Sequence, residues 1–498
     1  MFSPNLKEAK EISKNEEYKR IPISYELFSD IATPIEVLRI LKGISNHTYM
    51  LESVEDSKKW GRYTFLGFDP LLEFTCQNGI VNIKGDKDFN ELNDDEIVIE
   101  TDNPREIIKD LIEKNKSPKL KNLPPFTGGF VGYFAYDYIK YAEPTLNLDA
   151  ENQDRFKDID LMLFDKVIAF DNFRQKIILI INIKTDDLEG NYRRACDELL
   201  EMADLLKNGK KSDIVPLKLK SDFKPVFSRE KYCEMVEKAK NYIYEGDIFQ
   251  VVLSNRIEAE ISGSLFDTYR VLRTTNPSPY MFYFSSNDIE IAGASPETLV
   301  KLNDNKLYTF PLAGTRPRGK TDEEDHELEH DLLSDEKELA EHNMLVDLGR
   351  NDIGRISEIG SVKVEKYLSI ERFSHVMHIG STVTGDLRSD LDSLSAIDSI
   401  LPAGTLSGAP KIRACEIINE LEDNKRGIYG GAIGYVDLSG NIDTCISIRI
   451  AFARNNKVFI RSGAGIVADS VPEKEFEECL NKAAAVIDAL KTANGGLQ

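Results

Sequence analysis

The sequence predicts an α+β fold in which most of the sheet is antiparallel. Strand-like runs often occur in pairs separated by a short turn, and KVIAFDNFRQKIILIINI (166–183) holds two such runs. Such pairs form hairpins, whereas a doubly wound parallel sheet needs a helix between successive strands. The chain has 498 residues, which is too long for one ordinary domain and indicates two large parts.

The N-terminal part is predicted to be rich in strands. Residues 1–20 form a polar arm, frayed or helical, and lack the apolar run that a signal peptide would have. Residues 21–207 follow as the predicted N-terminal domain, which ends in a segment of helical periodicity at 188–207. Besides the pair above, its clearest strands are RYTFLGF (62–68), LLEFTC (71–76) and GIVNIKG (79–85).

A lysine-rich stretch at 208–225 is predicted to link the two parts, because it contains two prolines and no helical stripe. The C-terminal domain, 226–498, opens with a helix that begins after the N-cap Ser228 and stops at Gly246. Further helices are expected at 334–348, 389–400, 410–422 and 472–491. The expected strands are DIFQVVLSNRI (247–257), IEIAGAS (289–295), KLYTFPLAG (306–314), AIGYVDL (432–438), DTCISIRIAFA (443–453) and KVFIRSGAG (457–465).

Composition excludes several classes of protein. The net charge of −22 disfavours nucleic acid as a partner, because a phosphate-binding surface needs basic residues. Six scattered cysteines without a C-x-x-C pair are typical of reduced thiols in a cytoplasmic protein. The longest apolar runs, such as IILIINI (177–183), have the length of a strand and are too short to span a membrane.

The stretch HELEH (326–330) matches the H-E-x-x-H pattern of zinc hydrolases, in which two histidines one helical turn apart hold the metal. The third ligand that those enzymes carry downstream is missing, since Gly349 and Arg350 occupy that region. Eleven acidic residues lie between Asp322 and Glu341. We therefore interpret HELEH as part of a solvated acidic loop, and we keep a zinc hydrolase as an alternative.

Two glycine-containing segments resemble phosphate-binding motifs. SGAGIVA (462–468) fits G-x-G-x-x-A, but we expect no dinucleotide domain because about thirty residues follow it. Its small residues still let backbone N–H groups approach an anion closely. GTLSGAPK (404–411) has the wrong spacing for a P-loop, yet Ser407 and Pro410 fit the cap and first turn of a helix whose N-terminus faces an anion.

Two predicted helices each carry a pair of glutamates on one face. Glu338 and Glu341 form one pair, and Glu475 and Glu478 form the other, with Lys482 one turn further on. Both helices are apolar beyond these positions, so the pairs are expected near the buried side rather than on a solvated surface. Carboxylates from two helices, without cysteine or histidine ligands, suit a hard ion such as Mg²⁺ that keeps waters and shares the substrate.

Basic and hydroxyl side chains stand in strand-like or turn contexts at Arg316, Arg318, Arg449 and Thr405. An arginine in an apolar strand is seldom fully buried unless it is paired. The partner is either an internal aspartate or the carboxylate of a substrate. Together with the glutamate pairs, these residues predict a metal-dependent site for a carboxylate ligand in the C-terminal part.

A set of segments in fixed order carries a family resemblance through most of residues 226–490. They are PLAGTRPRG, KELAEHNMLVDLGRND, SHVMH, GTLSGAPK, YGGAIGY, DTCISIR, SGAGIVADSVPEKEFEE and NKA. With them the chain resembles the chorismate-utilising enzymes, most closely the large subunits of anthranilate synthases. YMLES (49–53) and RYTFLG (62–67) are similar to the N-terminal regulatory domain of those subunits. The resemblance implies packed antiparallel sheets flanked by helices, with chorismate and Mg²⁺ in a cleft.

The resemblance also implies ligand contacts, residue by residue. Glu341 and Glu478 resemble the Mg²⁺ ligands, with Glu338 and Glu475 as close or water-mediated helpers. Chorismate is a dianion, so the metal would neutralise one carboxylate while an arginine and backbone N–H groups hold the other. The expected chorismate contacts are Gly314, Thr315, Tyr429, Arg449, Gly463, Ala464, Gly465 and Lys482.

Three further residues resemble catalytic groups of the family. Glu297 is similar to the general acid that protonates the departing 4-hydroxyl, since loss of hydroxide is slow without a proton. A glutamate near other carboxylates in a closed cleft should have a raised pKa, which suits a proton donor. His378 resembles the histidine linked to elimination of pyruvate, and Thr405 resembles a hydroxyl that lines the same site.

Gln250 and Ala313 distinguish between members of the family. Relatives that add water have a lysine where this chain has Gln250, and a neutral glutamine is compatible with ammonia as the nucleophile. Relatives that make 4-amino-4-deoxychorismate often have a lysine where this chain has Ala313, which cannot act as a covalent nucleophile. Both residues favour amination at C2 and loss of pyruvate to give anthranilate, the first committed step of tryptophan biosynthesis.

The source of ammonia and the regulation of the enzyme also follow from the resemblance. None of the six cysteines lies in a G-x-C-x-G nucleophile turn, so we expect a separate glutamine amidotransferase subunit. LES (51–53) and NPSPYM (276–281) resemble a pocket for L-tryptophan as a feedback inhibitor; without the resemblance, NPSPYM would be a proline-rich turn. The expected inhibitor contacts are Ser53, Pro279, Tyr280 and Met281.

Three alternatives remain at this point. The nearest is component I of aminodeoxychorismate synthase, which the identity of the product would distinguish. A zinc hydrolase acting through HELEH is an alternative from another class. A non-catalytic subunit that only senses tryptophan is the third, and the intact set of Glu341, Glu478, His378 and Arg449 argues against it.

Overall fold

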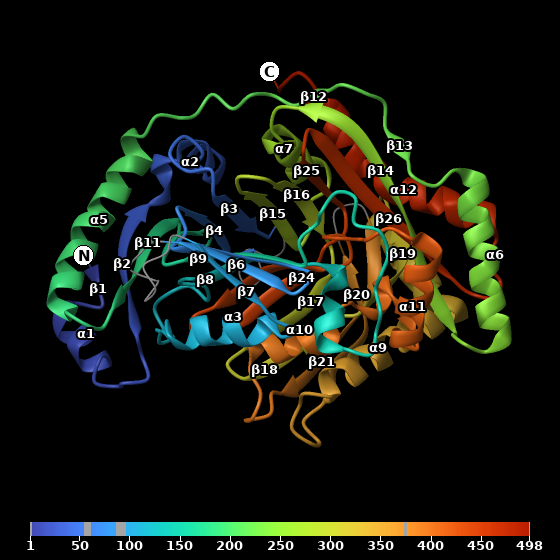
Figure 1. Ribbon diagram of the computed structural model, residues 1–498, viewed down its shortest axis with the longest axis horizontal. Helices are drawn as coiled ribbons and strands as arrows, with labels where there is room; N and C mark the ends of the chain where they lie inside the picture. The colour runs from blue at the N-terminus through green and yellow to red at the C-terminus, as the bar shows by residue number, and fades with distance from the viewer. Residues whose placement is uncertain (1, 54–60, 86–95, 373–375, 498) are drawn as a thin grey trace.

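Two large antiparallel sheets pack against each other in a computed structural model that describes residues 2–53, 61–85, 96–372 and 376–497 (Figure 1). The first two residues of SHVMH, 374 and 375, lie outside the described residues. Every strand pair within the two sheets is antiparallel, and helices flank them, so the predicted α+β fold is confirmed.

The larger sheet runs from the N-terminal arm to the C-terminal part. In spatial order its strands are β1 (Phe2–Ser3), β2 (Arg20–Phe28), β11 (Lys176–Lys184), β10 (Lys166–Asp171), β4 (Tyr63–Phe68), β3 (Thr48–Glu52), β15 (Tyr280–Ser285), β16 (Glu290–Ser295), β25 (Ile450–Arg454), β26 (Lys457–Ile466), β14 (Gln250–Ser262) and β12 (Lys218–Leu219). Two short strands, β13 (Lys224–Pro225) and β22 (Gly408–Ala409), also pair with β14.

The smaller sheet likewise mixes strands from distant parts of the sequence. In spatial order they are β19 (Leu312–Pro317), β21 (Val376–Asp386), β18 (Lys306–Thr309), β17 (Thr298–Asn303), β24 (Ile442–Ile446), β23 (Ala432–Asp437), β8 (Gly129–Phe134), β9 (Ile159–Phe164), β5 (Leu72–Gln77), β6 (Ile80–Gly85) and β7 (Glu96–Glu100). Strand β20 (Lys363–Arg372) pairs with β21.

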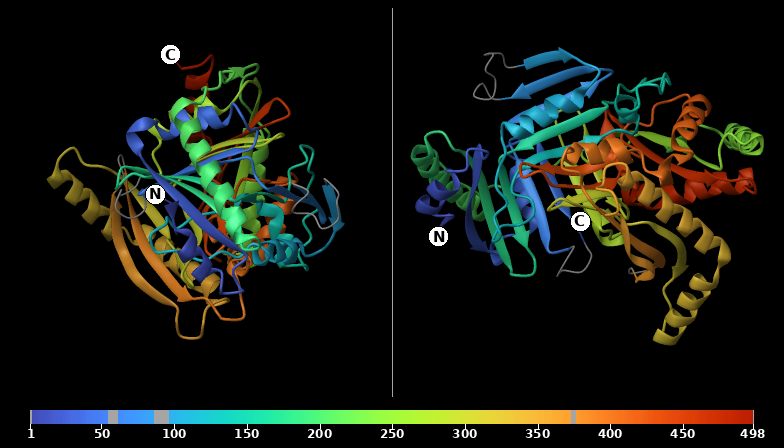
Figure 2. Two further views of the ribbon diagram at one scale, coloured as in Figure 1. Left: turned by 90° about the vertical axis from the view of Figure 1, so that its left-hand side faces the viewer. Right: turned by 90° about the horizontal axis from the view of Figure 1, so that it is seen from below.

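The helices cover the outer faces of the sheets. They are α1 (Leu6–Ile12), α2 (Pro34–Leu41), α3 (Pro104–Glu113), α4 (Ile139–Ala142), α5 (Leu188–Asn208), α6 (Arg229–Glu245), α7 (Phe266–Thr275), α8 (Asp322–Ser334), α9 (Glu336–Gly354), α10 (Ser393–Ile400), α11 (Lys411–Glu422) and α12 (Pro472–Ala493). Figure 2 shows α8 and the start of α9, coloured gold, extending away from the rest of the molecule. No helix of the described residues is long and apolar enough to cross a membrane.

Aromatic side chains fill the space between the two sheets. Phe126 and Tyr435 lie with ring centroids 4.4 Å apart, and Phe65 of the larger sheet contacts Tyr435 of the smaller one at 6.3 Å. Their clustering with other buried apolar residues forms one continuous core between the layers. This core fixes the spacing of the sheets and therefore the position of any site at their edges.

Each sheet joins a block of strands from the predicted N-terminal domain to a block from the predicted C-terminal domain. In the larger sheet β3 pairs with β15, and in the smaller sheet β8 pairs with β23. The division into two domains, 21–207 and 226–498, stays a prediction. Each of these ranges contributes strands to both sheets. The linker at 208–225 contributes β12 and β13 to the edge strand β14.

Most of the predicted elements form where the sequence patterns place them. The runs at 166–183 form the β10–β11 hairpin, and 188–207 forms α5. Ser228 caps α6 by accepting a hydrogen bond from the N–H of Lys231, and Gly246 ends the helix at a φ of 85°. The six cysteines are free thiols, as expected.

Four local predictions are wrong. The single strand expected at 306–314 is two strands, β18 and β19, which both pair with β21. HELEH lies on the helix α8 rather than in a loop, because Thr321 caps that helix and acidic residues fill its first turn. Ser407 does not cap α11, since its hydroxyl donates to the carbonyl of Ala403 and Pro410 occupies the N-cap. The single strand expected at 443–453 is two strands, β24 and β25, which belong to different sheets.

Candidate active site at the junction of the two sheets

The chain crosses between the two sheets at Glu297 and at Arg449. Glu297 lies between β16 and β17, and Arg449 lies between β24 and β25. Backbone hydrogen bonds hold the two crossings side by side. The N–H of Ile446 donates to the Glu297 carbonyl at 2.9 Å, and the N–H of Ala294 donates to the Arg449 carbonyl at 3.2 Å. Arg449 has a φ of 51°, a backbone conformation that residues other than glycine rarely adopt.

A cavity of about 870 Å³ opens where the sheets diverge at these crossings. It brings together side chains from both sheets and from the helices α9 and α12. The predicted site residues that line it are Gln250, Glu297, Ala313, Thr315, Glu341, His378, Thr405, Tyr429, Arg449, Gly463, Gly465, Glu475, Glu478 and Lys482.

Three of the residues predicted to act in catalysis or to bind chorismate or the metal lie outside this lining. Ala464 packs into the apolar core between α6, α11 and the larger sheet, because strand residues alternate in direction and its two neighbours face the cavity. Gly314 contributes a carbonyl that accepts a hydrogen bond from His378. Glu338 lies 3.6 Å from the guanidinium of Arg316 and does not line the cavity.

Glu297 has the environment of a proton donor. Burial raises the pKa of Glu297 to about 7, while a hydrogen bond from the Thr405 hydroxyl and the charges of Arg449 and Lys482 oppose the rise. The direction agrees with the sequence-based expectation, but burial causes it rather than neighbouring carboxylates. A carboxyl group with this pKa is partly protonated near neutral pH and can protonate a leaving oxygen.

His378 is held in one tautomer by the backbone. Its Nδ1 lies 2.8 Å from the Gly314 carbonyl oxygen, which can only accept, so the proton resides on Nδ1. Burial lowers the pKa of His378, with a smaller contribution from Arg449. A neutral imidazole with its proton on Nδ1 has a basic Nε2, which is the form required to remove a proton from a substrate.

The carboxylates of α9 and α12 form the acidic side of the cavity. Burial and the nearby charge of Glu338 raise the pKa of Glu341, and Glu478 adds to the rise. Burial and the charge of Glu478 also raise the pKa of Glu475. Carboxylates that destabilise one another in this way are a fitting donor set for a hard divalent cation, since its charge would relieve the repulsion.

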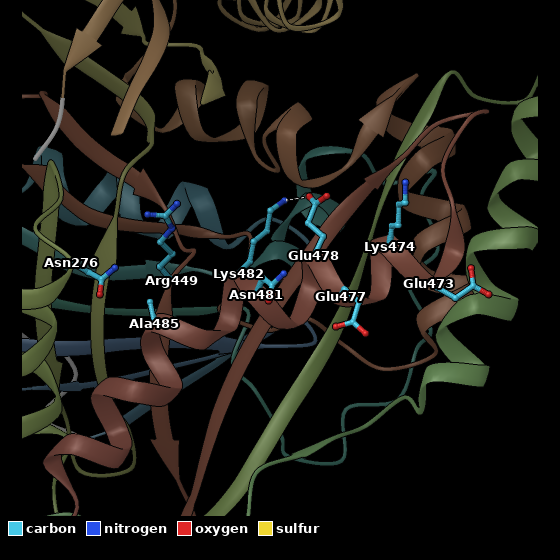
Figure 3. Close-up of a pocket in the computed structure, with 9 residues that line it drawn as sticks. All are labelled: Asn276, Arg449, Glu473, Lys474, Glu477, Glu478, Asn481, Lys482 and Ala485. Atoms are coloured by element: carbon cyan, nitrogen blue, oxygen red, sulfur yellow. Dashed lines mark ion pairs between the residues drawn. The ribbon is translucent and has the colours of Figure 1, made fainter. Parts of the chain in front are cut away.

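Lys482 lies at the edge of this acidic group. Its ammonium donates to Glu478 at 2.7 Å and to the carbonyl of Gly463 at 3.1 Å. In Figure 3, Lys482 and Glu478 point to the same side of α12, whereas Glu477 points away from them. The groove drawn there, about 740 Å³, shares Arg449, Glu478 and Lys482 with the cavity, so these residues line both.

Two glycines of SGAGIVA keep the cavity open at β26. A Cβ atom on Gly463 would lie 2.7 Å from the carbonyl oxygen of Leu253 and 3.1 Å from the Tyr429 hydroxyl. A Cβ atom on Gly465 would lie 2.9 Å from the Gln250 amide nitrogen. The backbone contact at Gly463 is too short for any side chain there, whereas at Gly465 the Gln250 amide would have to move aside.

A buried charged cluster behind the cavity was not predicted from the sequence. Glu422 binds both Arg426 and Arg461, and the side chains of all three residues are almost completely buried. Arg426 also donates to the carbonyls of Leu406 and Val252, two residues that line the cavity. An arginine inside the apolar strand KVFIRSGAG was the available signal, because such a residue requires a buried partner.

The zinc hypothesis finds no support in the position of HELEH. His326 and His330 are exposed on α8, where His326 contacts Glu329 and His330 contacts Ser334. Within the described ranges, the grouping of three acidic or imidazole ligands that lie within 4.8 Å contains no histidine: it is Glu73, Asp160 and Asp288.

That acidic grouping already surrounds a cation. The ammonium of Lys157 lies 2.9 Å from an Asp160 oxygen, 3.2 Å from Asp288 and 3.7 Å from Glu73. A lysine in this position neutralises the carboxylates and occupies the centre of the cluster. The cluster therefore joins β5, β9 and the β15–β16 turn as a structural ion network.

The two arginines of PLAGTRPRG have protein partners. Arg316 pairs with Asp331 at 2.6 Å and with Asp335 at 3.0 Å, and Arg318 pairs with Asp325 at 2.8 Å. These acids belong to α8 and to the residue that caps α9. The structural alternative, pairing with an internal aspartate, is therefore correct for these two arginines.

The segments that resemble an inhibitor pocket are neighbours in the larger sheet. Met281 lies opposite Glu52 in the β3–β15 pair, which brings NPSPYM next to LES. The Tyr280 hydroxyl donates to Asp443 at 2.9 Å, and Met281 is buried. The assignment of Ser53, Pro279, Tyr280 and Met281 to a tryptophan pocket stays a prediction.

Comparison with known proteins identifies relatives along almost the whole chain. The family model described as chorismate binding enzyme matches residues 52–488. Anthranilate synthase component 1 of Acetivibrio thermocellus is 45% identical over 99% of this chain and 99% of its own length. The protein of the same name from Aquifex aeolicus is 44% identical, with 98% of each chain covered.

Solved structures have the same fold. Anthranilate synthase component I from Streptococcus pneumoniae is 38% identical and has a TM-score of 0.73, covering 92% of this chain and 98% of its own. The menaquinone-specific isochorismate synthase from Escherichia coli has a TM-score of 0.68 at 18% identity, covering 97% of this chain and 98% of its own. The similarity to the isochorismate synthase shows that more distant proteins also have this fold.

Proposed function

Because this chain belongs to the family of chorismate-binding enzymes, we propose that it is an anthranilate synthase, which converts chorismate and ammonia to anthranilate and pyruvate. Relatives of that name are 42–45% identical over nearly the full chain. The observation that carries the proposal is the pairing of Gln250 and Glu297 in one cavity. The first suits a neutral nucleophile, and the second suits a leaving hydroxyl.

The chemistry needs an acid on one side of the ring and a nucleophile on the other. Ammonia forms a bond to C2 of chorismate, the ring double bonds shift, and the C4–O bond breaks. The proton of Glu297 passes to the departing oxygen, which leaves as water, and the added nitrogen loses a proton. Thr405 orients the Glu297 carboxyl for this transfer through its hydrogen bond.

Loss of pyruvate follows from the amino intermediate. A base must remove the C2 proton while the bond to the enolpyruvyl oxygen breaks, which restores the aromatic ring. His378 suits this role, because the hydrogen bond to Gly314 leaves Nε2 as its basic nitrogen. Burial lowers the pKa of His378, which favours the neutral imidazole.

Glu341 and Glu478 would hold Mg²⁺, with Glu475 beside them in the lining and Glu338 on the adjacent turn of α9. When bound, the ion would neutralise a carboxylate of chorismate and orient the ring. Arg449 and the backbone at Gly463 and Gly465 would hold the second carboxylate.

The residues at two positions favour this product over those of related enzymes. Gln250 lines the cavity where relatives that add water have a lysine, and an amide cannot activate water as a base. Ala313 also lines the cavity and has no nucleophilic group for the covalent route to aminodeoxychorismate.

The proposal includes a partner and an inhibitor. The designation component 1 among the relatives implies a partner subunit, and we propose that for this chain it supplies ammonia from glutamine. We also propose L-tryptophan as a feedback inhibitor that binds Ser53, Pro279, Tyr280 and Met281 at the β3–β15 pair. Inhibition from there requires two states of the enzyme with different affinities for tryptophan.

A fluorescence assay of the purified chain with chorismate and Mg²⁺ tests the proposed reaction. We expect anthranilate when ammonium is supplied and none when glutamine is supplied without a partner subunit. A non-fluorescent amino product from ammonium would favour aminodeoxychorismate synthase instead. Consumption of no chorismate would refute the enzymatic assignment.

A further inference from the structure

A second, much smaller cavity lies behind Glu297. Its volume is about 40 Å³, and it shares Glu297, Leu345 and Thr405 with the catalytic cavity. These three residues therefore form part of the wall between the two spaces. We call the smaller space the rear cavity.

A second carboxyl group, that of Asp352 near the end of α9, also lines the rear cavity. It accepts a hydrogen bond of 3.0 Å from the ammonium of Lys411, which also donates to the Ile400 carbonyl at 2.9 Å. The Asp352 side chain is 14% exposed, and the nearby Asn351 and Arg355 are exposed. The rear cavity therefore lies between a carboxyl group at the catalytic cavity and another close to the surface.

The size and the polar lining of the rear cavity suit water. A cavity needs about 10–15 Å³ to hold one water molecule, so there is room for at least one. The hydroxyl residues Thr309 and Thr405 line it together with the two acids, and a buried water needs two to four such partners. Much of the remaining wall is apolar, for example at Leu299 and Ala403, so a water there would bond to these polar groups.

The proposed reaction leaves Glu297 without its proton. The proton passes to the departing oxygen, and the acid must regain one before the next chorismate can react. The substrate, the amino intermediate and the products would cover the side of Glu297 that faces the catalytic cavity. The rear cavity reaches the same residue from behind and stays open to water throughout the cycle.

We propose that Asp352 returns a proton to Glu297 through water in the rear cavity. The inference rests on the proposed function and adds a proton route to its acid. The O–H bond of the Asp352 carboxyl breaks and its proton joins the water, while an O–H bond of that water breaks and its proton joins the Glu297 carboxylate. Asp352 then takes a proton from bulk water or from a buffer acid. Asp352 touches no reacting atom and acts only through Glu297.

The charges around Asp352 are compatible with this role. Burial raises the pKa of Asp352, while the positive charges of Lys411 on α11 and of Arg355 at the end of α9 oppose the rise. Burial likewise raises the pKa of Glu297 to about 7. Each carboxyl group therefore holds a proton at a higher pH than an exposed one would, as a donor and an acceptor of the same proton must.

Asp352→Asn tests the route, because the amide keeps an oxygen for Lys411 but is no acid. Anthranilate fluorescence is followed by stopped flow with chorismate, Mg²⁺ and ammonium, at a pH near the Glu297 value of about 7. The enzyme that starts with Glu297 protonated should complete its first turnover at the unmodified rate. Later turnovers should be at least tenfold slower, since Glu297 then waits for a proton.

The readout is the ratio of the first-turnover rate to the steady-state rate, compared with that of the unmodified chain. A purely structural defect slows both rates, whereas a lost proton route slows only the second. Ammonium is itself a proton donor, so its concentration is the same for all variants. A small buffer acid such as imidazolium should accelerate the later turnovers of Asp352→Asn, because it can carry protons in place of the lost carboxyl group.

Three further variants separate the proton route from other effects. Asp347→Asn alters an exposed acid of the same helix that pairs with Arg350 outside the rear cavity, and should leave the ratio unchanged. Lys411→Gln removes the charge of the ion pair but keeps Asp352 as an acid, and should also leave it unchanged. Ala403→Val fills the rear cavity without removing a polar group, and should raise the ratio as Asp352→Asn does.

The outcomes distinguish the route from the reaction itself. An unchanged ratio in Asp352→Asn would show that Glu297 regains its proton from the catalytic cavity, which would overturn the proposal. Equal slowing of the first and later turnovers would leave Asp352 with a structural role and would overturn it as well. If the unmodified chain makes no anthranilate from ammonium, the proposed function itself fails, and the proton route fails with it.

Discussion

The hydroxyl of Thr405 donates a hydrogen bond of 3.0 Å to a carboxylate oxygen of Glu297. Thr405 belongs to GTLSGAPK and Glu297 to the crossing between β16 and β17, more than a hundred residues apart in sequence. The bond favours the ionised carboxylate, whereas burial favours the protonated acid, and burial prevails. The two effects together set the pH at which the acid loses its proton.

Removing this hydroxyl should shift the pH profile upward. Thr405→Val removes a hydrogen bond that stabilises the ionised form, so the pKa of Glu297 rises above its value of about 7. Activity that needs the protonated acid then persists to higher pH. We expect the alkaline limb of kcat/KM, measured with the concentration of neutral ammonia held constant, to move to higher pH. Thr405→Ser keeps the hydroxyl and should leave the limb in place.

His378 should separate the two chemical steps. His378→Asn retains an N–H donor for the Gly314 carbonyl but has no basic nitrogen in place of Nε2. We expect chorismate to be consumed while anthranilate fluorescence falls by tenfold or more, since amination continues and pyruvate elimination stalls. Chromatography of the reaction mixture should reveal the amino intermediate. An equal loss of chorismate consumption and fluorescence would contradict the assignment of His378 to the second step.

Two substitutions on α12 test whether Glu478 binds the metal. Chelation with EDTA should abolish activity, and added Mg²⁺ should restore it. Glu478→Gln should raise the Mg²⁺ concentration needed for half-maximal rate by tenfold or more, because a ligand charge is lost. Glu477→Gln, one residue earlier and pointing away in Figure 3, is the matched control and should behave as the unmodified chain. The same shift in both variants would refute Glu478 as a ligand.

The buried charged cluster should matter more for stability than a surface ion pair. Glu422→Gln leaves Arg426 and Arg461 buried without their carboxylate, which costs about 3–5 kcal/mol in the free energy of unfolding. Arg413→Met breaks the exposed pair with Asp247 and should cost about 0–1 kcal/mol. Urea denaturation of the two variants checks the difference. Similar losses in both would show that the cluster is not essential to the fold.

Local patterns predicted most of the elements. The caps of α6, the β10–β11 hairpin and the helices α5, α11 and α12 follow from residues close together in the sequence. Both glutamates of the α12 pair and Glu341 of the α9 pair line the cavity, whereas Glu338 lies outside its lining. The helix at HELEH was missed, since its acidic composition resembles that of a loop.

The sequence by itself determined the types of the elements and the chemistry available to the site. Those properties depend on side-chain spacing and composition, which the linear order contains. Tertiary structure alone decided that DTCISIRIAFA is divided between two sheets and that Arg449 stands at the crossing opposite Glu297. The same packing decided that Arg426 and Arg461 share Glu422 behind the cavity. Each of these pairings joins residues far apart in the chain, and the burial that makes them necessary exists only after the sheets have packed.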